Sequence, residues 1–264
     1  MNQNDDDYNT IRLSEAQKML EHPKWQVRHE AVSIARNYTD TRAVDILITA
    51  LKDVYPEIRM DAATALGELA DIRAIEPLIE ALDDDVDEVR EFVALYGLGT
   101  LGEEAVNRLL QILTSTNPNL RLAAALALGR IGSKNSVEHL LTALKDHNSE
   151  VRGRVAETLG IIADERALPF LIELTKDDDN EVRGWAVSAL GQFNNRDVVE
   201  PLIHRIEDRT KSVQRLAVIA LGDIGDIGVV KALEELRQKY GGSEDIFIEA
   251  INSAIARIKE REGS

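Results

Sequence analysis

The sequence predicts an all-α solenoid in which one pair of helices repeats every 31 residues. Leucine keeps this spacing in seven copies: Leu47, Leu78, Leu109, Leu140, Leu171, Leu202 and Leu233. Arginine keeps it in six copies, each directly after Val, Ile or Leu: Arg28, Arg59, Arg90, Arg121, Arg152 and Arg183. Self-similarity at a fixed period of this length is typical of repeat proteins. We therefore expect about eight stacked helix pairs along the chain.

Each period contains two helical patterns. In residues 44–51, the apolar side chains fall at i, i+3, i+4 and i+7, which predicts the first helix of a pair, here called the A helix. Pro56 suits a first helical turn, and a second helix, the B helix, is expected to follow it. Its inward positions include the small residues Ala62 and Ala65, which allow helices to approach to roughly 8 Å. Because one pair cannot bury its apolar face alone, the pairs must stack.

The turns carry two recurrent aspartates. The first lies in an Asp-x-Arg-Ala turn at Asp40, Asp71 and Asp164, where it is expected to accept from free N–H groups at the start of the next A helix. The second lies six residues before the repeated arginine: Asp53, Asp84, Asp146, Asp177 and Asp208, with His22 and Ser115 as departures. We interpret the arginines and these aspartates as a ladder that ties neighbouring repeats together. The alternative is an alternating charge track for a ligand.

The ends of the chain differ from the repeats. Residues 1–11 are polar and acidic and predict a disordered N-terminal tail. Residues 12–260 predict a single solenoid domain, and residues 261–264 a short C-terminal tail.

Composition excludes several classes of function. The net charge of −16 disfavours a nucleic-acid partner, because phosphate binding needs clustered positive charge. The absence of cysteine excludes disulfides and thiolate metal sites. The sequence shows neither a signal peptide nor an apolar run long enough to insert into a membrane. We therefore expect a soluble cytoplasmic protein.

The repeat unit itself resembles a known family. Its best copies are residues 58–84, IRMDAATALGELADIRAIEPLIEALDD, and residues 151–178, VRGRVAETLGIIADERALPFLIELTKDD. They resemble HEAT repeats of the phycobilisome-lyase-like (PBS lyase HEAT-like) subclass, and the resemblance covers nearly the whole chain. It implies a right-handed α-α superhelix whose A helices are convex and whose B helices line a concave groove. It specifies function only weakly, because this repeat serves lyases, adaptors and assembly factors alike.

No residue constellation predicts catalysis. His29–Glu30 is similar to the His-Glu pairs with which a family of HEAT-repeat di-iron hydroxylases binds iron. The equivalent positions hold no further pair: Met60–Asp61, Glu91–Phe92, Leu122–Ala123, Gly153–Arg154, Gly184–Trp185 and Arg215–Leu216. One pair cannot hold two metal ions, and no phosphate-binding loop or nucleophile elbow occurs. We expect no catalytic residues, no metal and no cofactor.

The informative positions are those of the B helix that the repeat leaves free, at −3, +1, +2 and +5 from the repeated arginine. Their apolar and arginine members predict a partner-binding groove: Trp25, Met60, Phe92, Leu95, Leu122, Leu126, Arg154, Trp185, Leu216 and Ile219. Phe247 continues this series in the last repeat. Large apolar side chains on a solvated face are typical of a contact surface. The alternatives are that curvature buries them against neighbouring helices, or that the groove has a different helical phase.

The third repeat departs from the pattern. Gly99 comes one residue later than the phase of Gly67 predicts, and the following turn is shortened to GEEA. Two explanations remain open, an extra residue accommodated as a π-bulge or ordinary drift of the repeat.

We therefore predict a non-catalytic scaffold or adaptor that grips a partner protein of unknown identity in the groove. The alternatives are an auxiliary subunit of a bilin lyase or bilin-removing factor, or an assembly or maturation factor for a cofactor-containing complex. Handling of a bilin would shift the absorbance of an open-chain tetrapyrrole on mixing. The sequence leaves open whether the chain is a monomer or part of a hetero-complex.

Overall fold

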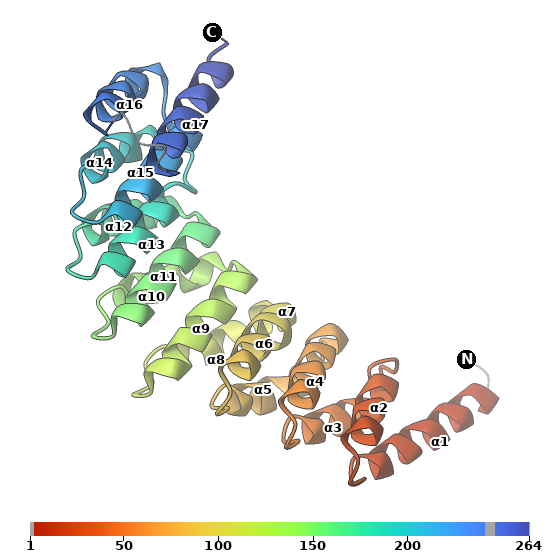
Figure 1. Ribbon diagram of the computed structural model, residues 1–264. Coiled ribbons are helices and arrows are strands. Elements are labelled where there is room, and N and C mark those ends of the chain that lie inside the picture. Colours follow the sequence, from red (N-terminus) through yellow and green to blue (C-terminus); the bar gives the residue numbers. More distant parts are fainter. Residues whose placement is uncertain (1–2, 241–245, 264) are drawn as a thin grey trace. The chain divides into compact units, whose positions relative to one another are not determined.

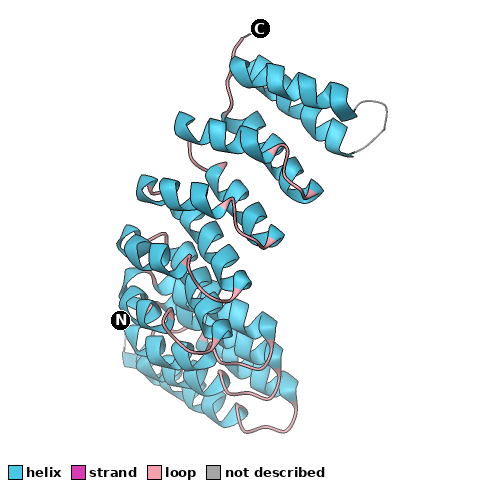
Figure 2. Cartoon of the chain, turned by 90° about the vertical axis from the view of Figure 1, so that its left-hand side faces the viewer, coloured by secondary structure: helices cyan, strands magenta, loops and turns pink. Residues whose placement is uncertain are grey.

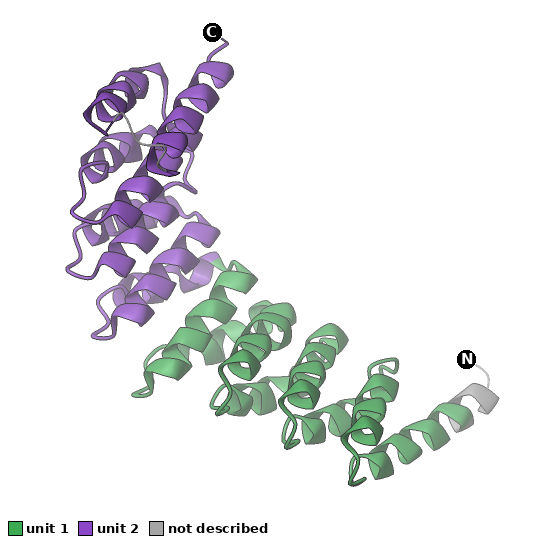
Figure 3. Ribbon diagram, viewed as in Figure 1, with its two compact units in different colours: residues 1–133 green, residues 134–264 purple. Residues whose placement is uncertain are grey.

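The computed structural model describes residues 3–240 and 246–263, and throughout these ranges the regular structure is helical, with no strand (Figure 2). The chain divides between Ser133 and Lys134 into two compact units, which are described separately (Figure 3). In the described ranges each unit contains four helix pairs. The all-α solenoid of about eight pairs is confirmed.

The first unit alternates A and B helices. Its A helices are α1 (Gln3–Met19), α3 (Thr41–Ala50), α5 (Ile75–Ala81) with the 3₁₀ turn η1 (Ile72–Ala74) before it, and α8 (Glu103–Ile112). Its B helices are α2 (Trp25–Ala35), α4 (Pro56–Leu69), the composite α6 (Asp87–Phe92), η2 (Val93–Leu98) and α7 (Gly99–Leu101), and α9 (Pro118–Ile131).

The second unit repeats the alternation. Its A helices are α10 (Val137–Ala143), α12 (Leu168–Leu174) and α14 (Val199–Arg205), each preceded by a 3₁₀ turn, and α16 (Ile227–Tyr240). Those turns are η3 (Lys134–Ser136), η4 (Glu165–Ala167) and η5 (Arg196–Val198). Its B helices are α11 (Ser149–Ile162), α13 (Asn180–Leu190), α15 (Lys211–Ile224) and α17 (Ile246–Arg261).

Each unit has two layers, one of A helices and one of B helices (Figure 1). Successive B helices lie side by side, as α11, α13, α15 and α17 do in the second unit. Alanine and leucine fill the space between the layers; Ala62, Ala65 and Leu66 of α4 have no solvent-exposed surface. The small residues let neighbouring helices pack closely, as the sequence predicts.

The Asp-x-Arg-Ala turns cap the A helices. Asp40, Asp71 and Asp164 each accept a hydrogen bond from the backbone N–H two residues later, over 2.8–3.1 Å. The arginine of the same turn also donates to the capping carboxylate. These side-chain and backbone hydrogen bonds lower the pKa of Asp40 and of Asp164 to about 2.

The arginine–aspartate ladder is also confirmed. In each of four rungs, the arginine of a B helix binds an aspartate in the turn of the next repeat: Arg28–Asp53, Arg59–Asp84, Arg152–Asp177 and Arg183–Asp208. Each of these arginines also donates to the backbone carbonyl six residues before it. Burial opposes ionisation of the four aspartates, but the arginine and a backbone N–H hold the pKa of each carboxyl below its usual value. The ladder is therefore part of the scaffold.

The N-terminal helix begins earlier than the sequence predicts. Helix α1 starts at Gln3, inside the segment expected to be a disordered tail, and residues 1 and 2 lie outside the described residues. At the other end α17 runs to Arg261, and Ser264 lies outside the described residues.

The third B helix contains a π-helix, η2, over Val93–Leu98. The extra residue in the sequence is therefore accommodated as a π-bulge rather than as drift. The helix then ends at Leu101, and Gly102, whose φ of 76° lies in the left-handed region, caps it. The backbone carbonyl of Tyr96 points at Gly67 of α4, where an added Cβ would lie only 1.9 Å from that oxygen. The π-bulge thus requires glycine at position 67.

Candidate functional site

All ten predicted groove residues lie on B helices with side chains that are at least partly accessible. Trp25, Phe92 and Trp185 are exposed, with 37–39% of their surface accessible. The other seven are half-buried: Met60, Leu95, Leu122, Leu126, Arg154, Leu216 and Ile219. The rung arginines on the same helices are more deeply buried, as Arg28, Arg59 and Arg183 show, and the Arg28 guanidinium lies over the Tyr55 ring at 5.4 Å from its centroid. The predicted positions thus share the free face of the B layer within each unit.

In the first unit, the free face presents two pairs of aromatic rings. Trp25 of α2 stacks on Tyr55, which directly precedes α4, at 5.9 Å between ring centroids and an interplanar angle of 27°. Phe92 packs on Tyr96 one turn later, at 5.0 Å. All four rings are exposed, so each pair offers one ring surface to solvent.

A polar contact links the first two B helices on this face. His29 of α2 and Asp61 of α4 approach to 2.7 Å between the ring Nε2 and a carboxylate oxygen. Both side chains are close to half exposed. His29 is thus engaged through one ring nitrogen by a carboxylate of the next repeat.

In the second unit, large side chains of the free face pack against glycines of the preceding repeat. A Cβ at Gly153 would lie 2.7 Å from the Trp185 ring, and one at Gly184 would lie 3.3 Å from Leu216. The guanidinium of Arg154 lies over the Trp185 ring at 6.0 Å from its centroid. The glycines at the +1 position therefore make room for the large side chain at the +2 position of the next helix.

Two parts of the predicted series need correction or addition. Phe247 is buried, with 4% exposure, and packs edge-on against Tyr240, because the last helix has an A helix and Lys211 around that position. It belongs to the core. Conversely, the sequence pattern missed Tyr55 and Tyr96, which lie just outside the four chosen positions. Tyr55 stacks on Trp25 of the preceding repeat, and Tyr96 packs on Phe92, one helical turn before it.

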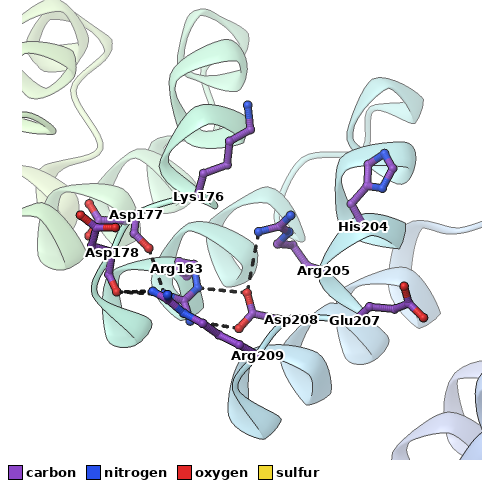
Figure 4. Close-up of a pocket in the computed structure, with 9 residues that line it drawn as sticks. All are labelled: Lys176, Asp177, Asp178, Arg183, His204, Arg205, Glu207, Asp208 and Arg209. Atoms are coloured by element: carbon purple, nitrogen blue, oxygen red, sulfur yellow. Dashed lines mark hydrogen bonds and ion pairs between the residues drawn. The ribbon is translucent and has the colours of Figure 1, made fainter.

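The second unit also contains a surface pocket of about 410 Å³ beside the turns that follow α12 and α14 (Figure 4). Its charges largely satisfy one another. Arg183 donates to both carboxylate oxygens of Asp208 over 3.0 Å and to the carbonyls of Asp177 and Asp178. Arg209 donates to the Asp178 carbonyl over 2.6 Å. The pocket is therefore the open side of a ladder rung.

Within residues 3–240 and 246–263, no three His, Asp or Glu side chains gather in a way that could hold a metal ion. No helix in these ranges is long and apolar enough to span a bilayer. The free face presents aromatic, apolar and charged side chains.

Comparison with known proteins identifies the repeat. The family model for HEAT repeats matches residues 14–99, 106–190 and 168–251. Comparison with curated proteins gives no match. The X-ray structure of Escherichia coli YibA is 21% identical with a TM-score of 0.53, and the alignment covers 98% of this chain and 97% of that one. This likeness is one of fold.

Two further solved structures are similar at lower TM-scores. Human deoxyhypusine hydroxylase is 21% identical with a TM-score of 0.42, over 97% of this chain and 99% of that one. The complex of CpcE and CpcF of phycocyanin lyase from Nostoc sp. is 22% identical with a TM-score of 0.42, over 93% and 94% of the chains. Neither likeness carries an argument about function.

Proposed function

This chain belongs to the HEAT-repeat family, and we propose that it is a non-catalytic scaffold that holds a partner protein against the free face of its B helices. One observation carries the proposal. Positions outside the rungs and caps, which solvent reaches, hold Trp25, Phe92 and Trp185 instead of polar residues. These rings keep more than a third of their surface exposed, and partly exposed aromatic side chains are the usual anchors of protein interfaces.

The scaffold explains most of the other conspicuous side chains. The repeated arginines and aspartates form rungs or helix caps, and the pocket of the second unit is lined by one rung. The rungs and caps do not account for the aromatic side chains of the free face, nor for single exposed apolar residues of the A layer such as Ile11 and Ile72.

The test combines Phe92→Glu with Leu122→Glu, on adjacent B helices of the first unit. Partner capture from the native host, quantified by affinity purification and mass spectrometry, should fall at least tenfold. Thermal unfolding should change little, because Phe92 is exposed and Leu122 is only half-buried. A matched control combines Ile11→Glu with Ile72→Glu, two exposed apolar residues of the A layer in the same unit. The control should retain capture.

Two results would overturn the proposal. If the Phe92/Leu122 variant unfolds at a much lower temperature, these residues belong to the core and the free face is misassigned. If it remains folded and retains every partner, the free face of the first unit is not the contact surface.

A further inference from the structure

The free face of the first unit carries acidic residues that the repeat does not require. Glu30 and Asp61 occupy the +2 position of α2 and α4, and Glu91 the +1 position of α6. The corresponding positions of the second unit hold glycine, arginine, tryptophan and leucine: Gly153, Arg154, Gly184, Trp185, Arg215 and Leu216. The carboxylates are therefore a property of the first unit and not of the fold.

This negative charge is only partly neutralised. Asp61 contacts His29, and Arg36, which directly follows α2, pairs with Glu68. Glu30 and Glu91 are exposed, and no ion pair or hydrogen bond of either side chain is present in the described part of the chain. A partner that buries this face must supply the missing positive charge, because an uncompensated buried carboxylate is costly.

Aromatic rings lie on the same helices as two of these carboxylates. Trp25 lies edge-on to His29, the residue before Glu30, at 6.3 Å between ring centroids. Phe92 directly follows Glu91 on α6. The charged group of a lysine or arginine can form an ion pair with a carboxylate and can also lie over an aromatic ring. Aromatic rings and carboxylates on one face thus favour a cation on an otherwise apolar segment, and the carboxylates repel an acidic one.

We infer that the free face of the first unit receives a cationic amphipathic segment of the partner protein. This inference rests on the proposed scaffold function and names the chemistry of its partner. Lysine or arginine side chains of the segment pair with Glu30 and Glu91, while its apolar side chains contact Met60, Phe92 and Leu95. The three helices α2, α4 and α6 span about 20 Å at a usual spacing of roughly 10 Å. A helical segment of about 14 residues would cover that distance at about 1.5 Å per residue.

The probe is a fluorescein-labelled 14-residue amphipathic peptide of leucine and lysine, with two otherwise identical peptides that carry glutamine or glutamate in place of lysine. Fluorescence anisotropy with the full chain measures the Kd of each. We expect the lysine peptide to bind at least tenfold more tightly than the glutamine peptide and the glutamate peptide not to bind. Combining Glu30→Gln with Glu91→Gln should raise the Kd of the lysine peptide at least tenfold.

The control must separate this face from the overall charge of −16. Glu15→Gln combined with Glu104→Gln removes the same charge from exposed positions on the A helices α1 and α8 of the same unit. It should change the Kd less than twofold. Equal weakening by both double variants would overturn the inference, since attraction would then come from net charge alone.

The remaining outcomes separate this inference from the proposed function. Equal affinity for the lysine and glutamine peptides would refute a cationic partner. Failure of all three peptides to bind would also refute it. In either case, loss of the native partner in the Phe92/Leu122 variant would still support the scaffold function, and retention of that partner would refute both.

Discussion

The rung formed by Arg183 and Asp208 should be among the most sensitive polar contacts in the second unit. Both side chains are only 3% exposed. The guanidinium donates to both carboxylate oxygens, to the carbonyls of Asp177 and Asp178 and to the Thr210 hydroxyl. Replacing Arg183 with methionine keeps much of the side-chain volume but leaves the Asp208 carboxylate without its main buried partner. Breaking a buried pair in this way costs about 3–5 kcal/mol.

Arg90 provides the matched control, because its rung is missing. The equivalent position in the next repeat is Ser115, and Arg90 instead pairs with the exposed Asp87 on its own helix and donates to the Asp84 carbonyl. Arg90→Met therefore loses one charged hydrogen bond and a surface ion pair, about 1–2 kcal/mol. The two variants make the same chemical change at equivalent positions of two B helices.

Urea unfolding followed by circular dichroism gives the two free energies, and hydrogen exchange shows where the chain opens. We expect Arg183→Met to be about 1–4 kcal/mol less stable than Arg90→Met, given the costs above. Its loss of protection should centre on α13 and the turn before α15, since effects in a repeat protein stay near the altered interface. Equal losses in the two variants would show that the ladder contributes little and that apolar packing alone holds the repeats together.

Three further predictions concern packing, pH and the π-helix. Leu171→Ala removes a fully buried side chain of α12 and should cost about 2–5 kcal/mol in urea unfolding, and a loss below about 1 kcal/mol would show that the site is loosely packed. Asp164→Asn keeps the cap but removes the charge. Folding lowers the pKa of Asp164 from an ordinary 3.8 to about 2. The stability that the charge contributes should therefore be present above about pH 4 and should be lost as the pH falls towards 2. The urea midpoints of the two proteins should therefore differ most at pH 7 and clearly less at pH 2.5, and a difference that is undiminished at pH 2.5 would place the effect elsewhere. Gly67→Ala should destabilise by about 3 kcal/mol because of the Tyr96 carbonyl, whereas Gly184→Ala meets only the flexible Leu216 side chain and should be nearly neutral in the same assay.

The repeat could be predicted well from the sequence because the fold is nearly one-dimensional. Each helix pair meets the same neighbours as the pair before it, so the same position needs the same kind of side chain in every copy. The leucines that recur with the period, from Leu47 to Leu233, accordingly have no exposed surface. Periodicity therefore identified the buried layer directly.

The ladder was predicted as a bond between repeats, but its register could not be derived. Arg59 has two candidate partners: Asp53, six residues before it, and Asp84, the equivalent aspartate of the next repeat. A strictly periodic sequence does not show which of the two binds the arginine. The structure shows that the carboxylate comes from the next repeat. The departure at His22 agrees with this register, because Arg28 lacks the earlier aspartate and still forms its rung with Asp53.

The candidate site was harder to predict, for two physical reasons. Phe247 has the same phase as the free positions, but the terminal repeat surrounds it with Tyr240 and Lys211, which periodicity does not encode. Tyr55 has no counterpart in the pattern because it lies at the end of a turn, yet its ring stacks on Trp25 of the preceding repeat. Contacts that depend on one side chain in one repeat leave no recurrent signal.

The third repeat shows how one inserted residue can change both the scaffold and the surface. The π-helix turns the Tyr96 carbonyl towards Gly67 and brings backbone to backbone, a contact that any side chain at position 67 would prevent. The same repeat lacks its rung, because Ser115 replaces the aspartate that would bind Arg90. This B helix therefore packs closely, backbone to backbone, on the preceding repeat, and it lacks the arginine–aspartate ion pair to the following repeat.

This irregular backbone also bears on the surface that the first unit presents. Glu91 and Phe92 lie directly before the π-helix, so any variant that restores a regular α-helix must also rotate the residues that follow them, including Tyr96. If Gly67→Ala forces that change, it should weaken binding of the lysine peptide without altering a single charge. Unchanged peptide affinity in a folded Gly67→Ala protein would instead show that the bulge serves packing alone.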